Sequence, residues 1–195
     1  MSLKIPRGPS FRPDLSTDPH EHSMWLPMSK QWVDPWALQM QHIHIDDIAL
    51  ALSNICRYNG HVEIPLSVAE HSINVMIECK SRVEKRKNFS CDSNLMLAGL
   101  LHDASEAYLG DVHGPSKKRP EYQWYRRIEN DLTDTIHARF GVEVTDDMAE
   151  VVAEADHLVF TREWRTNGGD MGRDLARRTF LSHFKWLVRE RAFGR

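Results

Sequence analysis

Apolar residues recur at helical spacing in nearly every segment that follows Asp46 in this 195-residue chain. Spacing of three and four residues places such side chains on one face of an α-helix, where they can form a core. No segment has the clear alternation of apolar and polar residues that is typical of a strand. We therefore expect an all-α fold. Helices are predicted from Asp46, from residue 67, over 95–110, over 125–141, over 145–164 and around 175–187.

Several of the predicted helices have recognisable ends and core faces. Ser67 and Glu70 have the spacing of a capping box, in which each side chain binds the other residue's backbone amide. Gly110 fits the end of the helix that begins near residue 95. The expected core positions are Ile48, Ala49, Leu52, Val68, Ser72, Val75, Met76, Cys79, Leu95, Leu97, Leu100, Leu101, Ala104, Tyr108, Tyr125, Ile128, Leu132, Ile136, Val152, Ala155, Val159, Phe160, Leu175, Ala176, Phe180, Phe184 and Leu187.

Residues 1–42 are expected to form an irregular arm that is rich in proline and tryptophan, followed by one domain over residues 43–195. Four prolines lie between Pro6 and Pro19, which disfavours regular structure there. The HIHI sequence at 42–45 is expected to be briefly extended. Trp25, Trp32 and Trp36 either pack on the core or a neighbouring subunit, which we favour, or stack on a bound base. With the apolar last helix, the arm favours a homodimer or higher homo-oligomer.

Charge and cysteine content exclude several classes of protein. The net charge is −3, whereas a protein that coats nucleic acid needs a basic face. The three cysteines form no CxxC pair, which suits a reducing compartment. The first residues lack the apolar region of a signal peptide, and no apolar run approaches the roughly 20 residues of a membrane span. We expect a cytoplasmic protein with neither a membrane nor a nucleic acid as its partner.

Residues 98–111, AGLLHDASEAYLGD, place three ionisable side chains within an apolar predicted helix. Adjacent residues such as His102 and Asp103 leave a helix roughly 100° apart, so both can reach one ion. Glu106 is four residues after His102 and is expected on the same face. A helical histidine beside an apolar stripe is usually a satisfied core residue, so His71 alone would indicate little. Together with Asp156, these residues form a mixed nitrogen and oxygen set that suits a divalent metal.

Longer sequence motifs around these residues resemble those of the HD-domain phosphohydrolases. They are ICRYNGH, SVAEHS and LLHDASEAYLGDV, followed by P-x-K, within residues 43–165. The pattern is similar to that of the YfbR-like HD proteins, which include bacterial 5′-deoxynucleotidases, and to phage-type dATP triphosphohydrolases. The resemblance implies an HD-domain helical bundle with one metal ion. The ligands that it implies are His71, His102, Asp103 and Asp156.

The resemblance also implies roles for residues around the metal. Glu106 would be the catalytic carboxylate, and Asp111 a second acid that contacts the substrate or orients a cation. Arg57 and Lys117 match positions that contact phosphate. Without the resemblance, both would be read as solvated surface charges.

Two further residues of the RYNGH sequence have open roles. Tyr58 and His61 either line the phosphate end of the substrate site or stabilise a structural turn.

Two departures from the family pattern leave the substrate open. The deoxynucleotidases have an Arg-Trp pair where this chain has Arg57-Tyr58, and one residue fewer separates this arginine from the following histidine of the motif. The loop after Gly110 reads GDVHGPSK and keeps only the second proline of the family's loop.

The sequence thus predicts a metal-dependent phosphohydrolase that acts on (deoxy)nucleotides, either a 5′-deoxynucleotidase or a dNTP phosphohydrolase. The cofactor would be one divalent ion: Zn, Co, Mn, Fe, Ni or Mg. The alternative is a non-catalytic module of HD fold that binds or senses a nucleotide. Glu106 argues against that alternative, because a module that only binds does not need a carboxylate beside the metal.

Overall fold

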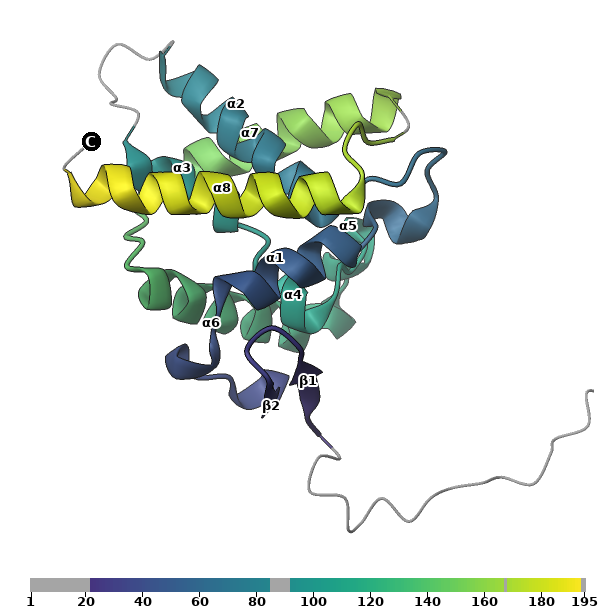
Figure 1. Cartoon of the computed structure of the whole chain (residues 1–195). Helices are drawn as coiled ribbons and strands as arrows, with labels where there is room; N and C mark the ends of the chain where they lie inside the picture. Colours follow the sequence, from purple (N-terminus) through teal and green to yellow (C-terminus); the bar gives the residue numbers. More distant parts are fainter. Residues whose placement is uncertain (1–21, 85–91, 167, 194–195) are drawn as a thin grey trace, which may run out of the picture.

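Helix α3 (Ser93–Leu101) lies at the centre of the fold because almost all of its surface is apolar. Its residues from Leu95 to Leu101 are all buried, which is the pattern of a helix covered on every side. Helices α2 and α7 pack against it on one side, and α8 crosses it on another (Figure 1). Asp92 begins the helix by accepting a hydrogen bond from the amide of Leu95 at 2.8 Å.

The computed structural model describes residues 22–84, 92–166 and 168–193, and within them the chain is predominantly α-helical, as predicted. Two short strands and several 3₁₀ turns complete this part. The elements besides α3 are β1 (Met24–Leu26), β2 (Gln31–Val33), α1 (Ile45–Asn54), α2 (Val68–Glu84), α4 (Glu106–Leu109), α5 (Gly114–Lys117), α6 (Gln123–Phe140), α7 (Asp146–Thr166) and α8 (Arg173–Ala192), with 3₁₀ helices at Pro35–Ala37, Met40–His42, Arg57–Gly60 and Pro120–Tyr122.

Two clusters of buried side chains hold the helices together. The larger cluster joins α1, α2, α3, α6 and α8 and includes Phe180 of α8, which is fully buried. The smaller one joins α2 and α3 to α7 through residues such as Val75, Leu95 and Ala155. Helix α2 contributes to both clusters, so its position is fixed from two sides.

Most of the expected core positions are buried, and a few are not. Phe160 and Leu175 were expected in the core, but their side chains are exposed. Both lie one residue beyond the buried stripe of their helix, next to Val159 and Ala176. Ile128 and Val152 are only partly buried.

The arm predicted to be irregular contains a hairpin in its described part. Strands β1 and β2 pair in antiparallel fashion, with Trp25 opposite Trp32. Asp47 of α1 holds the turn between them by accepting the amides of Met28 and Ser29 at 2.9 and 3.1 Å. The strands were missed because three residues are too short to show alternation. The proline-rich stretch before residue 20 lies outside the described residues.

The arm packs on the core through residues other than its tryptophans. Leu26 and Val33 enter the larger cluster, whereas Trp25, Trp32 and Trp36 are exposed. Of the HIHI sequence, only Ile43 and His44 are extended. His42 ends a 3₁₀ helix, and Ile45 begins α1.

Two predicted helix starts need correction. Helix α1 begins at Ile45 after His44, so Asp46 lies in its first turn and is not its cap. At the start of α2, the hydroxyl of Ser67 accepts the amide of Glu70 at 3.1 Å, as a capping box requires. The Glu70 carboxylate instead accepts the amide of Asp170 at 2.6 Å, and thereby holds the turn before α8.

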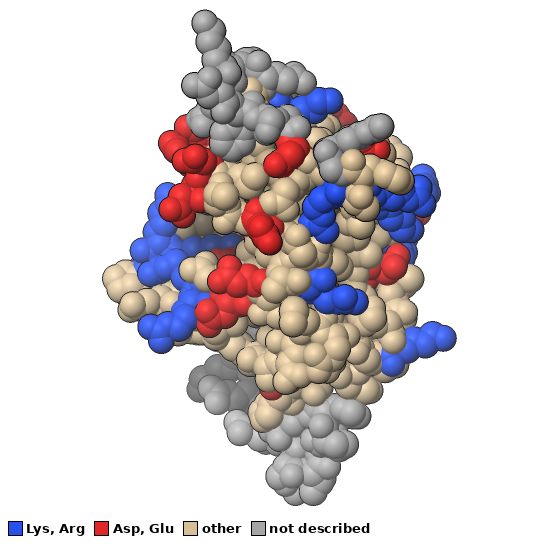
Figure 2. Space-filling view, turned by 90° about the vertical axis from the view of Figure 1, so that its left-hand side faces the viewer, with Lys and Arg blue, Asp and Glu red and all other residues tan. Residues whose placement is uncertain are grey.

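The charged surface is mixed. On the face drawn in Figure 2, lysine and arginine side chains alternate with aspartate and glutamate, without one continuous basic field. Among the described residues, no helix combines the length and apolar character that crossing a membrane requires.

We predict that Gly99→Ala lowers the free energy of unfolding. A Cβ at Gly99 would lie 3.0 Å from the Cys79 sulfur and 3.2 Å from the Met76 Cα, because α2 and α3 touch here. Overpacking of this kind costs about 1–3 kcal/mol, which exceeds the ~1 kcal/mol that alanine gains in helix propensity. Urea unfolding measures the difference. Gly114→Ala is the control, since nothing lies within 4 Å of its Cβ, and equal stability of both variants would contradict the prediction.

Candidate metal centre

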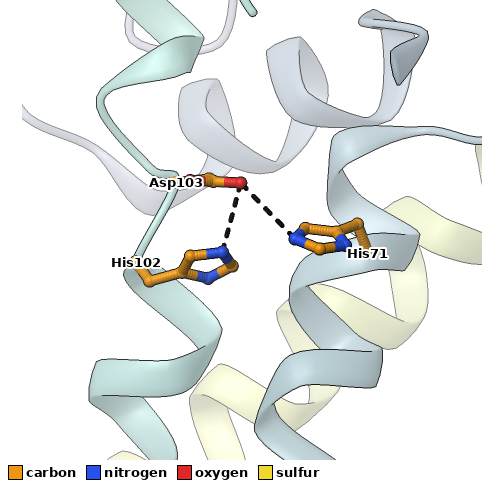
Figure 3. Close-up of side chains that lie close together, drawn as sticks. All are labelled: His71, His102 and Asp103. Carbon is orange, nitrogen blue, oxygen red and sulfur yellow. Dashed lines mark ion pairs between the residues drawn. The ribbon is translucent and has the colours of Figure 1, made fainter. Parts of the chain in front are cut away.

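Two helix segments bring His71, His102 and Asp103 to one point. One ligand atom from each residue lies within 4.8 Å of the others (Figure 3). His71 is fully buried in the first turn of α2, and His102 follows the last residue of α3. This group could hold a metal ion.

The segment that carries His102 and Asp103 is not the continuous helix that the sequence predicts. Helix α3 ends at Leu101, and α4 begins at Glu106. Between them the amides of Ala104 and Glu106 bond to carbonyls three residues back, in the 3₁₀ pattern. Asp103 can therefore turn its carboxylate to 3.1 Å from the His102 Nε2, which a continuous helix would keep apart. Gly110 ends α4 as expected, at a φ of 79°.

Hydrogen bonds at Nδ1 orient both imidazole rings. Nδ1 of His102 donates to the Gly99 carbonyl at 2.9 Å, and Nδ1 of His71 lies 3.0 Å from a Glu163 carboxylate oxygen. A neutral imidazole that donates from Nδ1 keeps a free lone pair on Nε2. Both Nε2 atoms are buried and face carboxylate oxygens, that of His102 at 3.1 Å from Asp103 and that of His71 at 3.0 Å from Asp156.

Asp156 of α7 completes the set of predicted ligands. Its Oδ1 lies 3.0 Å from Nε2 of His71, although it is not in the tightest group. Its side chain is 44% exposed, so the cluster opens to solvent on the α7 side.

The charges at this point leave room for a cation. Burial lowers the pKa of His102, but the adjacent Asp103 carboxylate outweighs burial and raises that pKa to about 9. Burial raises the pKa of Asp103, but His102, His71 and Arg57 outweigh it and hold the pKa well below its usual range. The pKa of Asp156 is also lowered, because the nearby His71 and His102 outweigh its burial. In the metal-free protein, the proton on His102 supplies positive charge beside the carboxylates of Asp103 and Asp156. A bound metal ion would supply that charge instead.

The residues present fit a divalent ion. Two buried imidazole nitrogens converge on the ionised carboxylate of Asp103, with the carboxylate of Asp156 beside them. Metal-binding histidines commonly donate their other ring nitrogen to a carbonyl or carboxylate, as both rings do here.

Glu106 is buried beside this centre and is paired with Lys117. The Lys117 ammonium lies 3.0 Å from Glu106 and 2.5 Å from Glu129 of α6. The second Glu106 oxygen, Oε2, is buried and has no hydrogen-bond partner among the described residues. Burial and the negative Asp103 raise the pKa of Glu106 to about 9, against the opposing effect of Lys117. Burial raises the pKa of Asp111, which also interacts electrostatically with Arg57, Asp103 and Lys117.

Arg57 also contacts Asp103, as part of a buried ion-pair network. Its guanidinium is 3.5 Å from Asp103 and 3.4 Å from Glu163. Tyr58 donates its hydroxyl to Glu163 at 3.4 Å, and the Arg57 guanidinium lies 5.5 Å from the Tyr58 ring centre. His61 is exposed and lines a small hollow with Tyr58 and Trp164.

Comparison with known proteins adds relatives without a described activity. No family model matches the chain. The uncharacterized protein YfdR of Escherichia coli (strain K12) is 34% identical over 131 residues, which are 67% of this chain and 64% of that protein. An uncharacterized protein of Rhodobacter capsulatus is 37% identical over 102 residues, which are 51% of this chain and 49% of that protein. The chain therefore spans less than two thirds of each relative.

Glu163 and Glu129 belong to the site and were missed in the sequence. Glu163 is the acid that holds His71 and Arg57, and its position after Val159 continues the buried stripe of α7. A glutamate on an apolar stripe is a signal that could have been noticed. Glu129 lies on α6 among exposed charges and gives no such signal.

A larger cavity of about 440 Å³ lies away from these residues. The end of α1, residues 64–67 and the turn before α8 form its walls. None of the candidate ligands lines it, and size alone does not make it the functional site.

We predict that metal binding releases at least one proton at pH 7. His102 is protonated below its pKa of about 9 in the metal-free protein, and a metal ion must displace that proton. Affinity should therefore rise with pH up to about 9 and level off above it. Calorimetry with Zn²⁺ or Mn²⁺ in buffers of different ionisation enthalpy counts the protons. Binding without proton release at pH 7 would contradict this assignment.

We predict that Glu163→Gln weakens metal binding by about 10- to 100-fold, the usual effect of removing a carboxylate behind a histidine ligand. Glutamine can still accept from Nδ1 of His71 but no longer supplies negative charge. Glu163→Leu, which removes both, should weaken binding further. Glu150→Gln on the exposed side of α7 is the control. Calorimetry measures the dissociation constant of the metal for each variant. Equal values for all three variants would show that Glu163 does not orient the ligand.

Proposed function

We propose that the chain is a metal-dependent phosphohydrolase that acts on (deoxy)nucleotides. The observation that carries the proposal is the buried, unpartnered oxygen of Glu106 beside a metal-competent cluster. Two cations, Arg57 and Lys117, lie next to the same acids. A proton acceptor, a metal site and two cations are the parts that phosphoester or phosphoanhydride hydrolysis uses.

The ligands His71, His102, Asp103 and Asp156 would hold one divalent ion. Imidazole with carboxylate favours Zn, Co, Mn, Fe or Ni, whereas Mg prefers oxygen ligands alone. When bound, the ion supplies Lewis acidity that activates a water molecule and draws charge from a phosphoryl oxygen.

Glu106 acts as the proton acceptor once a nearby cation lowers its pKa. A metal ion bound at Asp103 would oppose the burial and the negative charge that raise this pKa to about 9 in the metal-free protein. Lys117 holds Oε1 of this side chain, so Oε2 keeps a fixed orientation and is free to take a proton from water. Glu129 shares the ammonium and keeps Lys117 in place when Glu106 becomes neutral.

Arg57 and Lys117 stabilise charge on the phosphoryl oxygens. Arg57 is anchored by Asp103 and Glu163 and retains further donors for a substrate oxygen. Asp111, which lies within electrostatic range of both cations, helps to orient them.

We propose nucleotides as the substrate class because the sequence motifs resemble those of HD-domain phosphohydrolases. The number of phosphates is decided by experiment. Metal-loaded protein is incubated with deoxynucleoside and ribonucleoside mono-, di- and triphosphates, and the products are separated by chromatography. Release of phosphate, pyrophosphate or triphosphate identifies the subclass. Tight nucleotide binding without any product would instead indicate a binding module.

We predict that Glu106→Gln lowers kcat by about 10²- to 10⁴-fold, the usual contribution of a general base. Metal content should stay at the wild-type level, because Glu106 is not a ligand. Steady-state kinetics and elemental analysis on the same preparation separate the two effects. Glu121→Gln, at an exposed position, is the control. A fully active Glu106→Gln variant would overturn the assignment of the base.

A further inference from the structure

An aromatic row extends from the candidate metal centre along α7. Asp156, Phe160 and Trp164 are spaced four residues apart, so they share one face of the helix at intervals of about 6 Å along its axis. The adjacent face, with Ala155, Val159 and Glu163, is buried. Phe160 is 41% exposed and Trp164 is 66% exposed, although both belong to a helix that packs on the core.

Tyr58 joins this row from a different part of the chain. Its ring centre lies 6.0 Å from that of Phe160 and 5.9 Å from that of Trp164. Tyr58 and the following Asn59 have φ values of 58° and 53°. The left-handed region is costly for a bulky residue and is retained where the surroundings require it. The strained backbone thus places the Tyr58 ring against α7 while Arg57 reaches Asp103.

The row borders a hollow of about 80 Å³ between Tyr58, His61, Val62, Glu163 and Trp164. His61 thus lines the same hollow as Trp164 and Glu163. From Asp156, one helical turn reaches Phe160 and two turns, roughly 12 Å, reach Trp164. A nucleotide whose phosphate lies at the metal centre would extend its base over this distance.

We propose that Tyr58, Phe160 and Trp164 form a stacking shelf that binds the nucleobase of the substrate. The proposal rests on the proposed function, since it takes the phosphate to lie between Arg57 and Glu106. Exposed rings bind a base through its flat face, which all bases share. The shelf therefore accepts every base, with purines preferred for their larger area.

A second copy of the chain is a weaker explanation of the exposed rings. Phe160 and Trp164 together expose on the order of 200–250 Å², whereas a stable interface buries about 800 Å² on each partner. The position of the rings in line with Asp156, beside a hollow, matches a small planar ligand better than a protein surface.

The test compares ligands with and without a base in the full-length chain. Calorimetry in a Glu106→Gln background measures the binding of the deoxynucleoside mono- and triphosphates of all four bases and of 2-deoxyribose 5-phosphate. Trp164→Ala should weaken nucleotide binding by about 5- to 100-fold, the range for loss of one stacked ring. Binding of the sugar phosphate should change less than twofold. Trp164→Phe should retain most of the affinity, and Trp186→Ala, an exposed tryptophan of α8, is the control.

The outcomes separate the shelf from the reaction. If the wild type hydrolyses nucleotides but Trp164→Ala binds them normally, the shelf is wrong and the function stands. If nucleotides bind in a Trp164-dependent way but the wild type releases no product, the shelf stands and the hydrolase is wrong. Absence of any nucleotide binding overturns both. If Trp164→Ala converts a dimer into a monomer in sedimentation without changing nucleotide affinity, a second copy occupies the rings and the shelf is wrong.

Discussion

The hydrogen bond between His71 and Glu163 joins α2, which carries one ligand of the candidate metal centre, to α7, which carries Asp156. Both side chains are buried, and a charged carboxylate in that position is tolerated only when it is fully paired. Glu163 meets this requirement by contacting His71, Arg57 and Tyr58 together. The same contact leaves the other nitrogen of His71 facing Asp103 and Asp156. One hydrogen bond therefore both fixes the packing of α2 on α7 and orients the ligand.

Several carboxylates lie around this hydrogen bond, and their negative charge suits the site to binding a cation. Asp103, Asp156, Glu106 and Glu163 lie close together, with two imidazoles, Arg57 and Lys117 as compensation. Asp103 stays ionised because the nearby positive charges hold its pKa low, whereas burial favours the neutral form of Glu106. One region of the fold thus contains carboxylates suited to binding a cation and another suited to exchanging a proton.

Local patterns in the sequence were enough to predict the long helices and the three residues, His71, His102 and Asp103, that could hold a metal ion. Apolar spacing identifies α2 because Val68, Val75 and Cys79 are buried as expected, and the residue types of H…HD…D indicate ligand chemistry. The break after Leu101 could not be predicted, since no glycine or proline lies between it and Glu106. The pairing of His71 with Glu163 joins residues 92 positions apart and depends on how two helices pack. Likewise, Phe160 and Leu175 were misplaced because periodicity does not define the edge of a buried stripe.

The 3₁₀ turn after α3 gives the ligands unequal stiffness. His71 and His102 are each fixed by a second bond from the ring, one to a helix on the far side and one to the preceding helical turn. Asp103 lies on the short connection between two helices, and its carboxylate is held by contacts with Arg57, His71 and His102. Ions differ in their preferred ligand distances by a few tenths of an ångström. A bound ion would replace the contacts of Asp103 with the two imidazoles, so this carboxylate is the ligand best able to adjust to the ionic radius.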